Sequence, residues 1–280
     1  MEQFTLEILF QIIGIGSASG LVYKDNSLFI ISDNSSFLYE YHIQEKQLSK
    51  IKLLENSQEN IPKKEKFDFE AITLKEKKLH LLGSGSTSNR EKRLTYHLET
   101  AAIEKKNLSK LYQNLKETAS ISDEELNIEG ALFCNEKWLL LQRGNGANSK
   151  NGIAILNNKL NKNSTIEFIP IQLPKIKQVE TSFTDAILVE DKIYFLATAE
   201  DTTSTYDDGE VFGSTIGQMN SETFEIEFTK KISDNQKFEG LTLYKKTETE
   251  IQFLICEDND SDLLETVIYK LSIPNPSLTK

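Results

Sequence analysis

Short apolar runs alternate with polar turns along the whole chain, and most of them have the two-residue period of a β-strand. The first run, Phe4–Ile13, places Leu6, Ile8 and Phe10 on one side of the predicted strand. Groups of four similar runs follow. The strands of the first group are expected at 20–23, 28–32, 37–43 and 48–54. This succession of short strands predicts an all-β protein.

One short phrase opens each of five such groups. It consists of a residue with a side-chain oxygen, then Gly or Ala, then a small or branched apolar residue. Its copies are Ser19-Gly20-Leu21, Glu70-Ala71-Ile72, Glu129-Gly130-Ala131, Asp185-Ala186-Ile187 and Glu239-Gly240-Leu241. The copies recur at intervals of roughly 50 to 60 residues, a period that is typical of β-propellers and solenoids.

The number of predicted strands decides how the repeats are arranged. The first four repeats have four strands each and the fifth has three, so Phe4–Ile13 supplies the missing strand and removes an open sheet edge. We therefore predict an all-β, five-bladed β-propeller with four-stranded blades, one domain over residues 1–280, whose last blade is closed by the N-terminal strand. The fourth strand of the second repeat is expected at about Leu108–Leu115, although Asn107–Glu117 has near-helical apolar spacing.

Composition narrows the possible partners. The 280-residue chain is 38% hydrophobic and 27% charged, with a formal net charge of −11. This charge argues against nucleic acid and against an anionic membrane surface as general partners, whereas a small anionic molecule could bind beside local positive charge or a metal. The chain shows no apolar run long enough for a membrane span and no secretory signal, so we expect a cytoplasmic protein unless a leader preceded it. We also expect a monomer. Cys134 and Cys256 are expected to be buried and unpaired.

The repeated oxygen position has a chemical consequence. The innermost strands of a propeller line its central channel, so the five side chains should converge near the axis. They are Ser19, Glu70, Glu129, Asp185 and Glu239. Four carboxylates in one ring raise one another's pKa, and a bound cation would relieve this repulsion. Oxygen ligands without nearby Cys or His indicate Ca²⁺, and less strongly Mg²⁺. The alternative is a hydrated acidic channel without a metal.

A second set of polar residues follows the second strand of each repeat. Asp33 and Arg143 belong to this set, and they should surround the ring on the face that carries long loops such as Gly83–Arg93. Arg90 and Arg93 add positive charge, either toward a ligand or as a solvated loop. A metal with arginine and an acid above it suits a phosphate or carboxylate ligand.

The order Ser, Glu, Glu, a short polar residue and Glu at the start of five blades resembles the calcium-dependent nucleotidase (apyrase) family. The resemblance implies a five-bladed propeller with one calcium on its axis, which hydrolyses nucleoside di- or triphosphates. It assigns the metal positions to the five ring residues, where Asp185 replaces the family's usual serine. Asp33 would orient or activate water, in a segment where the family has two acids and an arginine. Arg143 stands where the family has paired arginines.

Three functional hypotheses follow. The first is a calcium-dependent hydrolase of phosphate esters or anhydrides, in which Asp33 acts on water and Arg143 stabilises charge. The second is a lactonase or esterase, as in other metal-centred propellers that the Glu-Gly phrases also resemble. The third is a non-catalytic propeller with a structural calcium, whose loop face binds a ligand or a protein. Release of phosphate, hydrolysis of lactones, or neither of the two would distinguish them.

Overall fold

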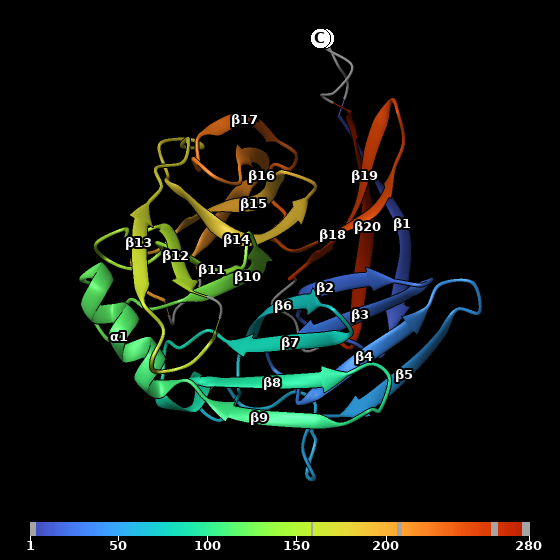
Figure 1. Ribbon diagram of the computed structural model, residues 1–280. Helices are drawn as coiled ribbons and strands as arrows, with labels where there is room; N and C mark the ends of the chain where they lie inside the picture. The colour runs from blue at the N-terminus through green and yellow to red at the C-terminus, as the bar shows by residue number, and fades with distance from the viewer. Residues whose placement is uncertain (1–3, 158, 206–208, 259–262, 276–280) are drawn as a thin grey trace.

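The computed structural model describes residues 4–157, 159–205, 209–258 and 263–275. Its strands form five antiparallel sheets of four strands each, and Figure 1 shows these sheets arranged in a ring. The architecture is a five-bladed β-propeller, so the prediction made from the repeated phrase is confirmed.

The strands of each blade run from the axis outward. The first blade contains β2 (Ala18–Lys24), β3 (Ser27–Ser32), β4 (Phe37–His42) and β5 (Gln47–Lys52). The second contains β6 (Phe69–Lys75), β7 (Lys78–Gly83), β8 (Lys92–His97) and β9 (Ile103–Asn107). The third contains β10 (Ile128–Cys134), β11 (Lys137–Gln142), β12 (Gly152–Asn157) and β13 (Ile166–Pro170). The fourth contains β14 (Thr181–Val189), β15 (Lys192–Asp201), β16 (Glu210–Asn220) and β17 (Ile226–Lys231). The fifth contains β18 (Phe238–Lys246), β19 (Glu250–Glu257), β20 (Glu265–Pro274) and β1 (Thr5–Ile13).

The fifth blade joins the two ends of the chain. Strand β1 pairs antiparallel with β20, with Thr5 opposite Ser272 and Ile13 opposite Glu265, and the two strands lie side by side in Figure 1. This pairing supplies the outer strand of the last blade, as the strand count predicted. It replaces an open edge of β20 with a regular ladder of backbone hydrogen bonds.

The small residue of each phrase allows the inner strands to approach one another closely. A Cβ atom added to Gly240 would lie 3.0 Å from Gly20 Cα on the inner strand of the first blade, and one added to Gly20 would lie 3.0 Å from Ile72 Cγ2 of the second blade. Larger side chains at this position would push neighbouring blades apart. The requirement for Gly or Ala therefore comes from the packing of the ring.

Each inner strand carries a β-bulge at the same place. The pairing with the second strand of the blade skips one residue, which we call the ring position of that blade. The ring positions are Ser19, Glu70, Glu129, Thr184 and Glu239. Four of them are the predicted ones, but in the fourth blade the ring position is Thr184. Asp185 lies one residue further, because Phe183 pairs with Ala197 and Asp185 with Leu196. The assignment of Asp185 to the ring is therefore corrected.

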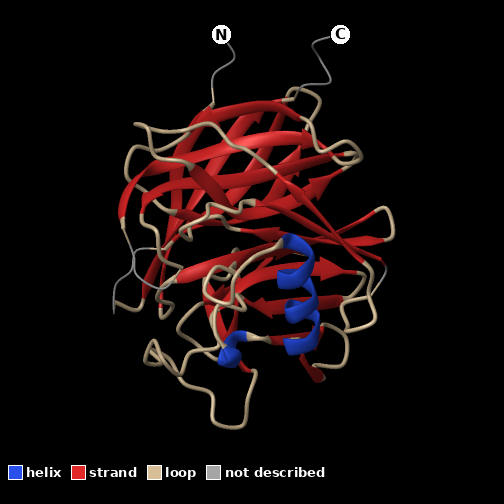
Figure 2. Cartoon of the chain, turned by 90° about the vertical axis from the view of Figure 1, so that its left-hand side faces the viewer, coloured by secondary structure: helices blue, strands red, loops and turns tan. Residues whose placement is uncertain are grey.

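The segment after β9 also differs from the prediction. The fourth strand of the second blade is β9, at Ile103–Asn107, and Leu108–Leu115 is not a strand. Helix α1 (Ser109–Ala119) occupies this region and buries Leu111, Tyr112 and Leu115 at helical spacing. Figure 2 shows it beside the strands, together with the short 3-10 helix η1 (Ser88–Arg90). The apolar side chains of α1 contribute to the core between the second and third blades. This packing favours a helix where the pattern of the other repeats predicted a strand.

Two smaller expectations can be compared with the fold. Cys134 and Cys256 are both buried and form no disulfide, as predicted. Within the described ranges, no helix has the length and apolar character needed to span a bilayer.

Candidate functional site

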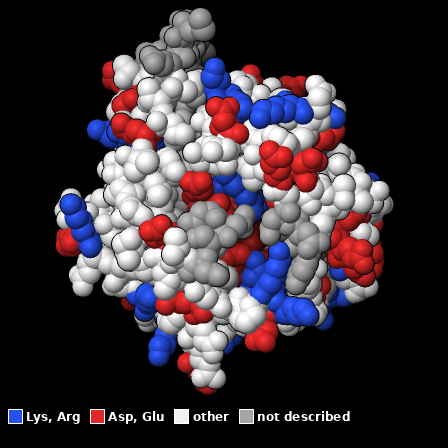
Figure 3. Space-filling view, turned by 180° about the vertical axis from the view of Figure 1, so that it is seen from behind, with Lys and Arg blue, Asp and Glu red and all other residues white. Residues whose placement is uncertain are grey.

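A cavity of about 320 Å³ lies at the centre of one face of the ring. Figure 3 shows this face with a central hollow in which acidic and basic side chains meet. The charged residues of the wall are Asp33, Lys63, Lys66, Asp68, Glu70, Arg90, Glu129, Arg143, Glu200, Lys237, Glu239 and Asp258. Loop residues such as Asn60 and Asn145 complete the wall. The ring positions and the long loops therefore share one face, as hairpin geometry predicted.

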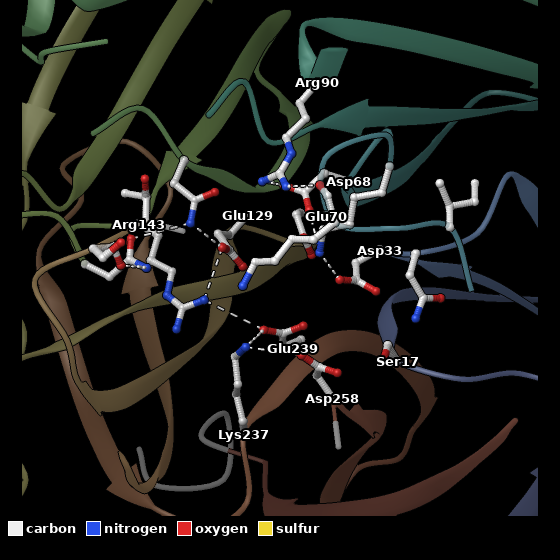
Figure 4. Close-up of a pocket in the computed structure, with 18 of the residues that line it drawn as sticks. Ser17, Asp33, Asp68, Glu70, Arg90, Glu129, Arg143, Lys237, Glu239 and Asp258 are labelled. Atoms are coloured by element: carbon white, nitrogen blue, oxygen red, sulfur yellow. Dashed lines mark hydrogen bonds and ion pairs between the residues drawn. The ribbon is translucent and has the colours of Figure 1, made fainter. Parts of the chain in front are cut away.

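Three of the five ring positions supply carboxylates to this cavity. Glu70, Glu129 and Glu239 all line it, and Figure 4 shows their side chains directed toward its centre. The bulge at each position turns the side chain out of the regular alternation of the strand and toward the axis. Asp33 and Arg143, the two predicted catalytic residues, line the same cavity.

The other two ring positions connect neighbouring blades. Ser19 Oγ donates a 2.5 Å hydrogen bond to Phe69 O, and Thr184 Oγ1 donates a 2.6 Å hydrogen bond to Phe238 O. Each acceptor immediately precedes the ring carboxylate of the next blade.

Asp185 has a comparable role one residue further along β14. Its Oδ1 accepts a 2.7 Å hydrogen bond from Ala186 N, and its Oδ2 accepts one of 2.7 Å from Leu241 N. Neither Ser19 nor Asp185 is part of the cavity wall. The structure thus brings together three of the five predicted metal ligands and directs the other two to the backbone.

Asp33, Asp68 and Glu70 form a compact acidic trio. One carboxylate oxygen from each can be chosen so that all three lie within 4.8 Å of one another. Lys66 Nζ contacts Asp33 and lies 2.9 Å from Asp68 Oδ1. Arg90 Nη1 lies 2.7 Å from Asp68 Oδ2. Lys66 and Arg90 therefore form ion pairs with two members of the trio, whereas Glu70 interacts with Lys66 only through its field.

Glu70 is the unmatched member. Its residue is 9% exposed, and its carboxylate has no hydrogen-bond or ion-pair partner among the described residues. Burial, followed by the fields of Asp68 and Glu129, raises the pKa of Glu70 well above its usual range. Asp33 Oδ1 is also buried without a partner. Burial raises the pKa of Asp33 to about 6, although the Lys66 ammonium acts in the opposite direction.

The opposite wall of the cavity is a buried ion-pair network. Arg143 Nη1 lies 3.1 Å from Glu129 Oε1 and 3.7 Å from Glu239 Oε1, and Nη2 contacts Glu200. Lys237 Nζ lies 3.0 Å from Glu239 and 3.2 Å from Asp258. These pairs keep Glu129 and Glu239 close to positive charge. Figure 4 shows the network facing the trio across the cavity.

Sequence reasoning missed the residues that precede each phrase by two positions. Ser17, Asp68, Asn127 and Lys237 all line the cavity, two residues before the ring positions of their blades. Their constant spacing from the phrase was available as a signal in the sequence, since each directly precedes the first strand of its blade. Lys66 belongs to the loop before β6 and follows no pattern among the repeats.

The donor set of the trio suits a hard cation. It consists of carboxylate oxygens alone, and it contains the unmatched Glu70 and the unpartnered Asp33 Oδ1. Ca²⁺ and Mg²⁺ prefer such oxygen ligands, and Ca²⁺ tolerates irregular geometry better. The residues therefore fit the predicted kind of metal at the side of the cavity.

Solved structures resemble this chain in fold. The M. xanthus glutaminyl cyclase has 8% identity and a TM-score of 0.56, with 98% of this chain and 99% of that chain covered. The allergen Mala s 1 of Malassezia sympodialis has 11% identity and a TM-score of 0.56, with 93% and 95% covered. A luciferin-regenerating enzyme has 10% identity and a TM-score of 0.52, with 96% and 95% covered. At these identities the likeness concerns the fold alone.

Sequence comparisons add a family. No curated protein matches the chain. A family model, described as a family of unknown function (DUF6929), matches residues 14–273. None of the proteins named here is an apyrase, so the nucleotidase resemblance stays a prediction.

Proposed function

The chain belongs to the DUF6929 family, whose function is unknown, and on the chemistry of the axial cavity we propose a cation-dependent hydrolase of phosphate esters or anhydrides. The observation that carries the proposal is the unmatched Glu70 carboxylate beside Asp33 and Asp68. These three residues would hold Ca²⁺ or, less favourably, Mg²⁺. The bound cation would polarise a phosphoryl oxygen and neutralise the trio.

In this proposal Asp33 would act on water. Its Oδ1 is buried without a partner, so a water molecule beside it could donate a hydrogen bond to this oxygen and be oriented by it. Lys66 contacts its other oxygen and fixes the orientation of the carboxylate. A water molecule beside Asp33 could thus be activated for attack on a phosphorus atom.

Two basic side chains of the cavity wall could contact an anionic substrate once a bound cation has neutralised the trio. Arg143 and Lys237 face the trio, and both are fixed by buried carboxylates. Arg143 would stabilise negative charge on the phosphoryl group while it holds Glu129 in place. A volume of about 320 Å³ admits a small molecule, at the lower end of the usual range of ligand pockets, which is about 300 to 1,000 Å³.

The test is release of inorganic phosphate from nucleoside di- and triphosphates in Ca²⁺ and in chelator. We expect activity only in Ca²⁺, and a loss of at least 100-fold in Glu70→Gln and in Asp33→Asn. Glu167→Gln, an exposed carboxylate on β13, is the matched control and should keep full activity. Activity that persists in chelator or in Glu70→Gln would contradict the proposal, and cleavage of lactones instead of phosphates would favour the esterase hypothesis.

One observation favours a second candidate, a non-catalytic binding cavity without a metal. Lys66 Nζ contacts both Asp33 and Asp68, so its ammonium already stands where a cation would bind these two residues. In that case Ca²⁺ would not raise the melting temperature of the wild type but would raise that of Lys66→Met. A rise in the wild type that is lost in Glu70→Gln would instead support the hydrolase.

A further inference from the structure

A second cavity of about 340 Å³ lies between the second and third blades and shares no wall residue with the axial cavity. We call it the basic groove. Five basic side chains line it, and Glu76 is the acidic residue of its described wall. The five are Lys75, Lys78, Arg93, Lys106 and Lys159. So much positive charge in one place is unexpected in a chain with a formal net charge of −11.

Arg93 is the central observation. Its residue is 7% exposed, its Nε atom is buried without a partner, and its guanidinium forms no hydrogen bond or ion pair with any described residue. Arg143 in the axial cavity, by contrast, has three carboxylates around it. Burying part of a charged group without a partner is unfavourable, and an anion bound to the guanidinium would offset this cost.

Glu104, whose field acts on Arg93, does not provide this anion. Its carboxylate is bonded to His97, with 2.8 Å between Oε1 and Nε2. His80, which also lines the groove, is held neutral, because burial and the field of Arg93 lower its pKa to about 3. The charge of Arg93 therefore remains unmatched by the surrounding side chains.

The lysines are arranged along the same groove. Lys75 Nζ lies 3.4 Å from the centre of the Phe133 ring and 5.6 Å from that of Trp138, so aromatic faces fix its position. None of the four lysines forms an ion pair with a described residue. Lys106 and Lys159 are exposed and leave the groove accessible from solvent.

We propose that the basic groove binds a small molecule with two or more phosphate groups, one of which pairs with the buried Arg93 guanidinium. Arginine binds phosphate oxygens bidentately, and the lysines would neutralise the remaining charge. The groove volume fits a small ligand. Because Arg93 is buried, the ligand needs a terminal group that enters the groove, which the backbone of a nucleic-acid duplex lacks. The proposal is independent of the hydrolase hypothesis.

The chain offers a direct reporter for this site. Trp138 is its one tryptophan, and the ring lies in the groove wall, 5.1 Å from the ring of His80. Pyrophosphate should therefore change the intrinsic fluorescence in a saturable way when it is titrated into the protein in chelator. Isothermal titration calorimetry should give the same affinity.

Variants separate the groove from the axial cavity. Arg93→Gln should weaken pyrophosphate binding at least tenfold, and the double variant Lys106→Gln/Lys159→Gln at least threefold, while Glu70→Gln and the exposed control Lys230→Gln should bind as the wild type does. The double variant alters exposed residues and keeps the test valid if Arg93→Gln fails to fold. Wild-type affinity in both groove variants, equal affinity for sulfate, or tighter binding of a short DNA duplex would each overturn the proposal.

Discussion

Glu70→Gln gives the sharpest test of the axial site, because the two possible roles of this residue predict opposite changes in stability. Gln has the same shape without the charge. In chelator the wild type must either keep the Glu70 carboxylate charged in the cavity or protonate it on folding, because burial raises its pKa, and both cost stability. The variant has a neutral amide and avoids this cost. An unsatisfied buried polar group costs about 1 to 3 kcal/mol, and a charged one more. We therefore expect the variant to be more stable than the wild type in chelator.

In Ca²⁺ the order should reverse. A ligand at 100 times its dissociation constant stabilises the native state by about 2.7 kcal/mol, and the variant would lose most of this gain. For a chain of this size, about 1 kcal/mol corresponds to a change of roughly 2 to 4 °C in melting temperature. Differential scanning calorimetry of both proteins, in chelator and in saturating Ca²⁺, measures all four values. An equal rise in Ca²⁺ for wild type and variant would refute the reasoning, because the cation would then bind without Glu70.

Three further predictions concern the ring and the groove. Ser19→Ala should lower the free energy of unfolding by about 0.5 to 1.5 kcal/mol, because the hydrogen bond to Phe69 O is lost. The loss should be the same in Ca²⁺ and in chelator. A loss found only in Ca²⁺ would instead identify Ser19 as a ligand of the cation. Gly240→Ala should lower the free energy of unfolding, measured in urea, by about 1 to 3 kcal/mol, because the new Cβ would lie 2.6 Å from Cys256 Sγ. Gly130→Ala should lower it less, because its nearest neighbour would lie 3.3 Å away. Equal losses in the two variants would exclude close packing as the reason. Burial lowers the pKa of His80 to about 3 in the folded state, so the unfolded state binds a proton first as the pH falls. The free energy of unfolding should therefore decrease by about 2 kcal/mol between pH 7 and pH 5. Urea denaturation of His80→Gln should lack this decrease, and the same pH dependence in the variant would show that His80 is not its source.

The sequence was sufficient for the fold because the propeller imposes local requirements at every blade. The ring position is a bulge, and in four of the five blades Gly or Ala follows it, which leaves a repeated trace such as Glu129-Gly130. The same trace was misread by one residue in the fourth blade, where Thr184 and Asp185 both carry side-chain oxygens and only the strand pairing distinguishes them. Helix α1 was missed because its buried face is defined by the space between two blades.

The site was less predictable than the fold. Ring residues can be found by repetition, but the cations that surround them come from different kinds of positions. Lys237 precedes its ring position by two residues, Arg143 follows a second strand, and Lys66 belongs to a loop. The unmatched state of Glu70 and of Arg93 depends on which side chains come within bonding distance. That information exists only after the blades are assembled.

Glu70 and Arg93 together indicate two bound species of opposite charge. Each is a buried ionisable group without a hydrogen-bond or ion-pair partner among the described residues, and the two lie in cavities that share no wall residue. A buried unmatched charge lowers stability, whereas the neighbouring pairs of Arg143 and Lys237 show that this chain can match such charges internally. The unmatched groups are therefore best explained by ligands, a cation beside Glu70 and an anion beside Arg93. Neither ligand can satisfy both cavities, so the two gains in stability should be separable when they are measured apart. The gain from Ca²⁺ should be lost in Glu70→Gln and kept in Arg93→Gln, and the gain from pyrophosphate in chelator should be lost in Arg93→Gln and kept in Glu70→Gln.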